Sequence, residues 1–170
     1  MVMDTLAGLA FSFEPALLEY MHEPPKKKNE RIINKYMINE ILFTGIYSSI
    51  LCILFLKLPI FHMFYRNSIN YFLTAFFALL IFIDVFNAFN ARTHRLNILS
   101  NLRKNKVFIL IIIFIIIIQI VMIYYGGSLF RTSGLTLKEL IITILIAFTV
   151  IPIDNIRKLL LRVKGIKGGV

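Results

Sequence analysis

Residues 71–91 read YFLTAFFALLIFIDVFNAFNA, and this stretch decides the fold. At about 1.5 Å per residue, a helix of this length crosses the roughly 30 Å hydrocarbon core of a bilayer. Asp84 is the single charged residue in the stretch. Because a carboxylate in hydrocarbon is costly unless water, a cation or a partner group attends it, intramembrane acids usually mark an ion pathway or a buried ion pair. The sequence predicts a membrane-spanning helix with such an acid inside it.

Three further segments have the length and composition of membrane spans. They cover about 38–56, 107–125 and 140–160. The chain has 170 residues, is 58% hydrophobic and contains no Trp, which excludes an ordinary soluble domain. We therefore predict an all-α, polytopic membrane helical bundle: one half helix, followed by four transmembrane helices within residues 38–161.

The net charge of +10 is distributed unevenly over the loops. Loops on one expected side of the membrane contain four of the nineteen Lys and Arg residues. The other fifteen lie on the opposite side. Those fifteen are Lys26, Lys27, Lys28, Arg31, Lys35, Arg92, Arg95, Arg103, Lys104, Lys106, Arg157, Lys158, Arg162, Lys164 and Lys167. Because positive loops stay inside, we expect an integral, multi-pass protein with a cytoplasmic C-terminus. Membrane lipids are the expected contacts of these cations, and nucleic acid is not an expected partner.

The N-terminal segment has the character of half a helix. Residues 1–14 are apolar and rich in small side chains, but they are too few to span a bilayer. We expect them to be the second half of a transmembrane helix, with Asp4 inside it. Residues 15–37, which contain Pro24-Pro25 and three lysines, are expected to form a cytoplasmic connector. Residues 162–170 are expected to form a cytoplasmic tail.

No recognisable catalytic or cofactor motif occurs in the chain. Cys52 is the single cysteine, and His22, His62 and His94 are scattered over three loops without metal-ligand spacing. Neither a phosphate-binding loop nor a nucleophile motif is present. We therefore expect no catalytic residue and no cofactor in this chain.

Four segments carry a resemblance to P-type cation pumps. MDTLAGLAFSFEP at residues 3–15, followed by Glu23-Pro24-Pro25, resembles the second half of their sixth transmembrane helix and the loop after it. FNAFNAR at residues 86–92 resembles the end of the eighth helix. QIV at residues 119–121 with Gly126-Gly127 and Phe130 resembles the ninth, and PID at residues 152–154 with Arg157-Lys158 resembles the tenth. The similarity spans the chain in order, and the plasma-membrane-type calcium ATPases are the most similar variant.

This resemblance implies a transported cation and two residues that bind it. Asp4 matches the sixth-helix aspartate that gives oxygens to the cation, and Asp84 matches an eighth-helix position where the sarcoplasmic-reticulum pumps have a glutamate ligand. Met3 departs from the threonine ligand of those pumps and agrees with the plasma-membrane type. Calcium is the implied ion, bound only when the rest of a pump supplies the other ligands. Asn87, one helical turn from Asp84, is expected to support this acid.

We therefore expect the chain to be the C-terminal membrane portion of a P-type ATPase, with the rest of such a pump as its partner. The chain alone should hydrolyse no ATP, since the phosphorylation and nucleotide-binding motifs of the family lie outside it. The alternative is an independent small membrane protein, either a pump-interacting subunit or an ion conduit. At the residue level, the alternative for Asp84, Asn87 and Asn90 is that they form hydrogen bonds between helices.

Three further residues carry structural predictions. Asp154 should form an ion pair with Arg157, three residues later on the same helix. Pro152 should kink the last span. Glu40 should lie in the first turn of a helix, where its charge would favour the helix dipole.

Overall fold

The computed structural model describes residues 2–14, 35–66, 68–93, 96–99, 102–127 and 132–163. The predicted connector and tail lie mostly outside these residues. The described part is helical throughout its regular structure. Its α-helices are α1 (Val2–Ser12), α2 (Lys35–Lys57), α3 (Pro59–Phe64), α4 (Ile69–Arg92), α5 (Lys106–Tyr125), α7 (Leu137–Phe148) and α8 (Val150–Val163), and a short 3₁₀ helix, η2 (Leu102–Lys104), precedes α5.

Four segments are long and apolar enough to cross a membrane. They are Tyr36–Lys57, Ile69–Arg92, Lys106–Tyr125 and Leu137–Val163, the last formed by α7 and α8 together. The predicted all-α bundle with four spans is therefore confirmed, and the protein is a multi-pass membrane protein. Each span extends slightly beyond its predicted limits, because polar residues such as Lys35 and Arg92 continue the helices past the apolar core.

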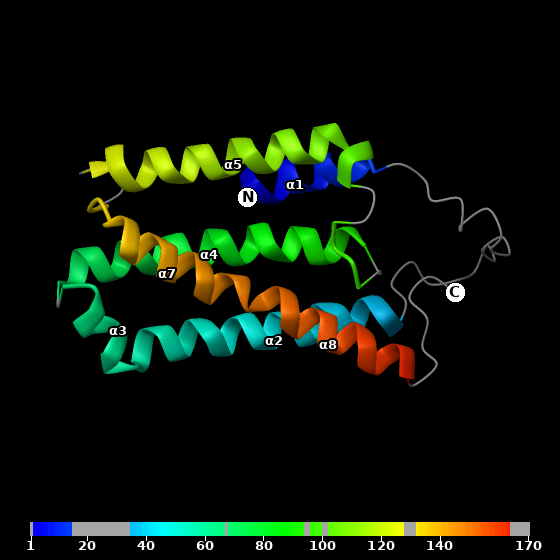
Figure 1. The fold of residues 1–170 in the computed structure, drawn as a ribbon, viewed down its shortest axis with the longest axis horizontal. Coiled ribbons are helices and arrows are strands. Elements are labelled where there is room, and N and C mark those ends of the chain that lie inside the picture. Colours follow the sequence, from blue (N-terminus) through cyan, green and yellow to red (C-terminus); the bar gives the residue numbers. More distant parts are fainter. Residues whose placement is uncertain are drawn as a thin grey trace, which may run out of the picture.

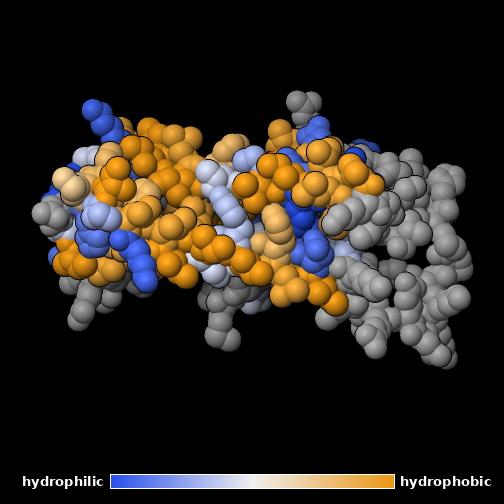
Figure 2. Space-filling model, turned by 90° about the horizontal axis from the view of Figure 1, so that it is seen from below, coloured by the Kyte–Doolittle hydropathy of each residue, from blue (hydrophilic) through white to orange (hydrophobic). Residues whose placement is uncertain are grey.

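Helix α4 lies at the centre of the bundle and contacts α2, α5, α7 and α8 (Figure 1). Helices α1, α4 and α8 end at one end of the bundle, where α2 and α5 begin. We call this the basic end, because Arg92, Lys104, Arg157 and Lys158 lie there. In Figure 2, hydrophobic residues cover most of the described surface between the hydrophilic residues. Such a surface suits contact with lipid or with other membrane helices.

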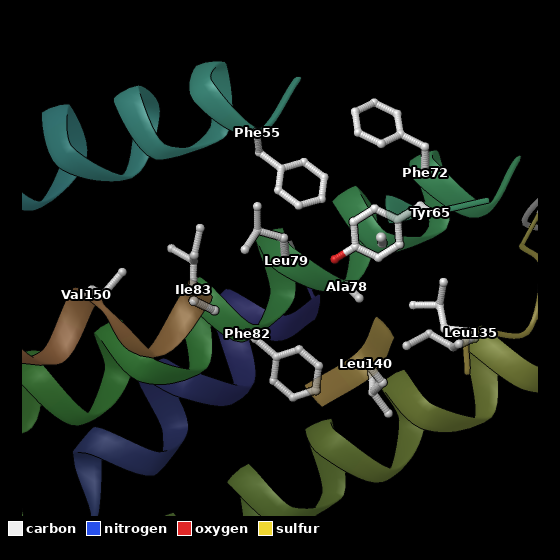
Figure 3. Packing of buried hydrophobic residues seen from close by; sticks show 13 residues of the cluster. Phe55, Tyr65, Phe72, Ala78, Leu79, Phe82, Ile83, Leu135, Leu140 and Val150 are labelled. Atoms are coloured by element: carbon white, nitrogen blue, oxygen red, sulfur yellow. The ribbon is translucent and has the colours of Figure 1, made fainter. Parts of the chain in front are cut away.

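Aromatic rings pack together at the end opposite the basic end. Phe55 of α2 stacks on Phe72 of α4, with ring centroids 5.4 Å apart (Figure 3). It also stacks on Phe61 of α3, at 4.8 Å. Tyr65 lies beside them, is fully buried and shares a 2.8 Å hydrogen bond with Thr143 of α7. Burial is the main cause that raises the pKa of the Tyr65 hydroxyl, so this group stays neutral. The cluster fixes α2, α3 and α4 as one hairpin.

The last span is interrupted at Thr149, three residues before Pro152. Helix α7 ends at Phe148, and the Thr149 backbone N–H donates to the carbonyl oxygen of Ile146 at 3.2 Å, a tighter turn than in an α-helix. Pro152 has no N–H to donate to the carbonyl of Phe148, and its ring crowds that carbonyl. The helix is thus interrupted near Pro152, and the predicted kink itself stays a prediction.

A cluster of buried charges joins α8 to α2 and α4 at the basic end. Asp154 accepts a 2.6 Å hydrogen bond from Arg157 Nε and lies 2.9 Å from Lys158 Nζ. Lys158 also donates to the backbone carbonyls of Asn90 and Thr93, which end α4. The predicted ion pair of Asp154 and Arg157 is confirmed. The prediction for Glu40 is wrong: α2 begins at Lys35, so Glu40 lies beyond the first turn, and it pairs with Arg157 at 3.5 Å.

Candidate cation site

Helix α1 packs alongside α5 at the edge of the bundle (Figure 1). Ala10 is completely buried, and Phe11 packs on Phe108 of α5 with ring centroids 6.1 Å apart. Leu6 and Phe11 join an apolar cluster with residues of α4 and α5. The half helix is therefore an ordered part of the bundle, and it forms one wall of a cavity.

This cavity holds about 220 Å³ and lies between α1, α4 and α5. Helix α4 contributes Asp84 and Asn87, and helix α1 contributes Ala7 and Phe11. The remaining lining residues are Val85, Ala88, Ala91, Ile112 and Ile115. Asp84 and Asn87 are thus the polar residues of a mostly apolar cavity, which lies in the half of α4 toward the basic end.

Asp84 is exposed on the surface of this chain, although it lies in the middle of α4. Its neighbours in the sequence, Ile83 and Val85, are each 3% exposed. The face of α4 that carries Asp84 is therefore exposed here, while the adjacent faces are buried. A carboxylate at this depth requires water, a cation or further polypeptide on its exposed side. The position fits a site that is completed from outside the chain.

Asn87 and Asn90 lie on the same helix but differ in the hydrogen bonds of their side chains. The side-chain amide of Asn90 donates to the carbonyl oxygen of Val150 at 3.3 Å, which is the predicted alternative of a hydrogen bond between helices. The side-chain oxygen of Asn87 is buried and accepts no hydrogen bond from the described residues. A buried acceptor without a donor is costly. The Asn87 oxygen is therefore suited to a cation or to a donor that enters the cavity.

Asp4 lies in the first turns of α1. Its side chain is outside the described residues, but its backbone belongs to α1. Asp4 precedes Ala7 by three residues and Phe11 by seven, and residues at this spacing lie on the same face of a helix. Ala7 and Phe11 line the cavity, so position 4 lies on the α1 face that continues the cavity wall.

Within the described residues, no three His, Cys, Asp or Glu side chains gather into a group that could hold a metal ion. A calcium ion takes six to eight oxygen ligands, more than Asp84 and its neighbour Asn87 could supply. Cation binding by Asp84 therefore stays a prediction at this point.

Sequence reasoning missed the polar contacts that hold α1 in place. Glu14, just after α1, pairs with Arg92 at 2.9 Å and accepts a 2.7 Å hydrogen bond from Asn105. One signal was available, since Asn105 precedes a long apolar run and asparagine is a common N-cap. Its side-chain oxygen does accept from the Phe108 N–H. Nothing in one sequence pairs Glu14 with a residue 78 positions away.

Comparison with known proteins decides the family. Residues 1–160 match the model of the cation transporting ATPase C-terminus. This chain belongs to that family. The resemblance seen in the four ordered segments is thereby confirmed, and the cation-transporting ATPase C-terminus accounts for the membrane-spanning bundle described above.

Individual relatives of this ATPase C-terminus are calcium pumps by name. It is 31% identical to calcium-transporting ATPase PAT1 of Dictyostelium discoideum over 100% of its own length and 16% of that protein. It is 28% identical to plasma membrane calcium-transporting ATPase mca-1 of Caenorhabditis elegans, over 88% of the chain and 13% of the relative. It is also 28% identical to plasma membrane-type calcium-transporting ATPase 9 of Arabidopsis thaliana, over 94% and 15%. The chain therefore spans about a seventh of the length of these relatives.

Proposed function

We propose that this chain forms the C-terminal part of the transport region in a P-type ATPase and that calcium is the transported ion. Asp84 and Asp4 provide oxygens to the ion, and Asn87 supports Asp84 from the neighbouring turn of α4. The remaining ligands, the phosphorylated aspartate and the nucleotide domain come from the rest of the pump. The chain alone hydrolyses no ATP.

The exposed position of Asp84 on the cavity is the observation that carries this proposal. A calcium ion neutralises carboxylates and prefers oxygen ligands at about 2.3–2.6 Å, which makes an acid at this depth tolerable. Asn87 lines the same cavity, and its buried side-chain oxygen accepts no hydrogen bond from the described residues, which leaves it available to support Asp84. A purely structural Asp84 would instead be expected to be buried inside the bundle, as Asp154 is at 1% exposed.

The relative register of α1 and α4 supports the role of Asp4. Both helices run toward the basic end, and Glu14 contacts Arg92, 78 positions later (Figure 1). The same separation brings Asp4 level with Phe82, two residues before Asp84. Two residues correspond to about 3 Å along a helix axis. The backbones of the two aspartates therefore lie at similar depth, on opposite sides of the cavity.

We further propose that the basic end faces the cytoplasm and that the pump resides in the plasma membrane. The cations at this end, among them Lys104, Lys106 and Arg162, follow the positive-inside rule. The names of the plasma-membrane relatives support the choice of membrane. In this orientation α1 descends from the middle of the membrane to the cytoplasmic side.

Complementation of a truncated pump tests the proposal. The chain is expressed in membranes with a polypeptide that carries the preceding portion of a plasma-membrane-type relative, and ATP-dependent calcium uptake is measured. We expect uptake from the pair and from neither part alone. Asp84→Asn and Asp4→Asn should each reduce the apparent calcium affinity by about tenfold or more, because each removes a charged ligand. Tyr125→Phe, at a side chain that is 85% exposed and far from the cavity, is the control and should pump normally.

Two outcomes would contradict the proposal. The first is an assembled pair that takes up no calcium. The second is calcium flux into liposomes from the chain alone that disappears in Asp84→Leu, which would favour the independent ion conduit.

A further inference from the structure

One carboxylate at the end of α1 joins three elements of the bundle. Glu14 accepts hydrogen bonds from Arg92 Nη1 of α4 at 2.9 Å and from Asn105 Nδ2, at the start of α5, at 2.7 Å. The side chain of Arg92 is 0% exposed and that of Glu14 is 25% exposed. Charge-assisted hydrogen bonds of this kind are short, directional and among the strongest in proteins. We call Glu14, Arg92 and Asn105 the Glu14 clamp.

Both partners of Glu14 are themselves held in place. Arg92 also donates to the carbonyl oxygen of Ile98 at 2.7 Å, and its guanidinium lies 5.4 Å from the centre of the Phe108 ring. Asn105 caps α5 through the Phe108 N–H, and its amide also donates to the carbonyl oxygen of Ala10 in the last turn of α1. The clamp therefore ties the end of α1 to rigid points on α4 and α5.

The packing of α1 on α4 and α5 is mainly apolar, through Leu6, Ala10 and Phe11. Apolar side chains between membrane helices gain no hydrophobic free energy relative to lipid. Their contacts have no preferred direction, so they resist a small axial shift less than the directional hydrogen bonds of Glu14 do.

Axial position matters because a helix transmits displacement along its whole length. Glu14 follows Asp4 by ten residues, about 15 Å along the axis, with continuous helix between them up to Ser12. A slip of one residue moves Asp4 by about 1.5 Å. Calcium–oxygen distances vary over only about 0.3 Å, so such a slip would remove Asp4 from the coordination sphere.

We propose that the Glu14 clamp sets the depth of α1 and thereby positions Asp4 opposite Asp84. The role of the clamp in calcium binding rests on the proposed function. Its effect on the depth of α1 does not depend on that function. The three residues of the clamp are positioning residues, since they lie at the end of α1 near the basic end and do not line the cavity.

The test combines a distance with a binding curve, both in the complemented pump. Glu14→Gln keeps the shape of the side chain and removes its charge, so it disturbs folding less than a change at the buried Arg92. In a Cys52→Ala background, nitroxides at Leu9→Cys and Leu110→Cys, both exposed positions on α1 and α5, report the height of α1 by pulsed electron paramagnetic resonance. Calcium uptake in the unlabelled proteins gives the apparent affinity and the maximal rate.

We expect Glu14→Gln to shift or broaden the distance between the nitroxides. It should also weaken the apparent calcium affinity by about tenfold, the lower bound for losing a group that orients a metal ligand, with a smaller change in maximal rate. Arg66→Gln is the matched control: it breaks the 3.0 Å ion pair with Glu139 at the opposite end and should change neither quantity.

An unchanged distance in Glu14→Gln overturns the clamp. A changed distance with unchanged calcium affinity overturns the positioning of Asp4. Failure of the proposed function is recognised separately, because the parent pair would then take up no calcium while the nitroxide distance would still respond to Glu14→Gln.

Discussion

At the scale of single residues, the aspartates of α4 and α8 show how surroundings decide the role of an acid. Asp154 is 1% exposed and lies between Arg157 and Lys158 on its own helix. Asp84 is exposed and lines a cavity that is open to the outside of the chain. The first arrangement is that of a structural ion pair, and the second is the one expected of an acid with the proposed role in cation binding.

Asp154→Asn should therefore destabilise the bundle. Removal of one member of a buried ion pair leaves the others uncompensated, which costs about 3–5 kcal/mol. Thermal unfolding of the purified chain in detergent measures the effect, and Asp84→Asn serves as the comparison. Equal loss of stability in the two variants would contradict the distinction drawn between these aspartates.

Asn87→Leu should separate binding from stability. The buried oxygen of Asn87 accepts no hydrogen bond from the described residues, so an apolar side chain of similar size should leave the unfolding temperature unchanged or raise it. In the complemented pump, the same change should weaken the apparent calcium affinity, because it removes support from Asp84. A fall in stability with unchanged affinity would instead assign Asn87 to the scaffold.

At the scale of helices, α7 and α8 show what the break at Thr149 achieves. The carbonyl of Val150, just after the break, accepts the hydrogen bond from Asn90 of α4, and the hydroxyl of Thr149 accepts one from Tyr47 of α2 at 2.7 Å. These two hydrogen bonds join the last span to α2 and α4 beside the break.

Pro152→Ala should restore a continuous helix across this junction. The new N–H at position 152 can donate to the carbonyl of Phe148, and alanine is the best helix former. Pulsed electron paramagnetic resonance between nitroxides at Leu137→Cys and Val163→Cys, both exposed ends of the span, should report a longer distance than in the parent protein in a Cys52→Ala background. An identical distance would show that packing, rather than the proline, imposes the bend.

The sequence predicts the spans well and the contacts between them poorly. Hydropathy alone located the four long helices, and the spacing of Asp154 and Arg157 gave their ion pair, because both signals are local. The additional contact of Arg157 with Glu40 and the Glu14 clamp join residues far apart in the chain, and no local pattern encodes them. The same reason explains why Asp84 could be named as a candidate while its outward orientation required the structure.

At the scale of the whole molecule, the two ends of the bundle differ in chemistry. Among the described residues, four of the five ion pairs lie at the basic end, whereas the opposite end has stacked aromatic rings and the single ion pair of Arg66 with Glu139. This polarity agrees with the proposed orientation, in which the basic end faces the cytoplasm.

Labelling of single cysteines tests this orientation. In a Cys52→Ala background, Met63→Cys in α3 is 75% exposed, and Lys104→Cys is exposed at the basic end. A membrane-impermeant maleimide applied to intact cells should modify Met63→Cys at once and Lys104→Cys only after permeabilisation. The reverse pattern would invert the proposed topology.

The aromatic packing of Phe55, Phe61 and Phe72 also bears on the order in which the protein is made. These rings lie within one short stretch of chain, so α2, α3 and α4 can associate as a pair of spans while the ribosome is still translating α5. The charges of α8 reach Glu40 and Asn90 only after synthesis of the final span. Biogenesis should thus begin with a hairpin held by aromatic rings and finish when the cations of α8 form their contacts at the basic end.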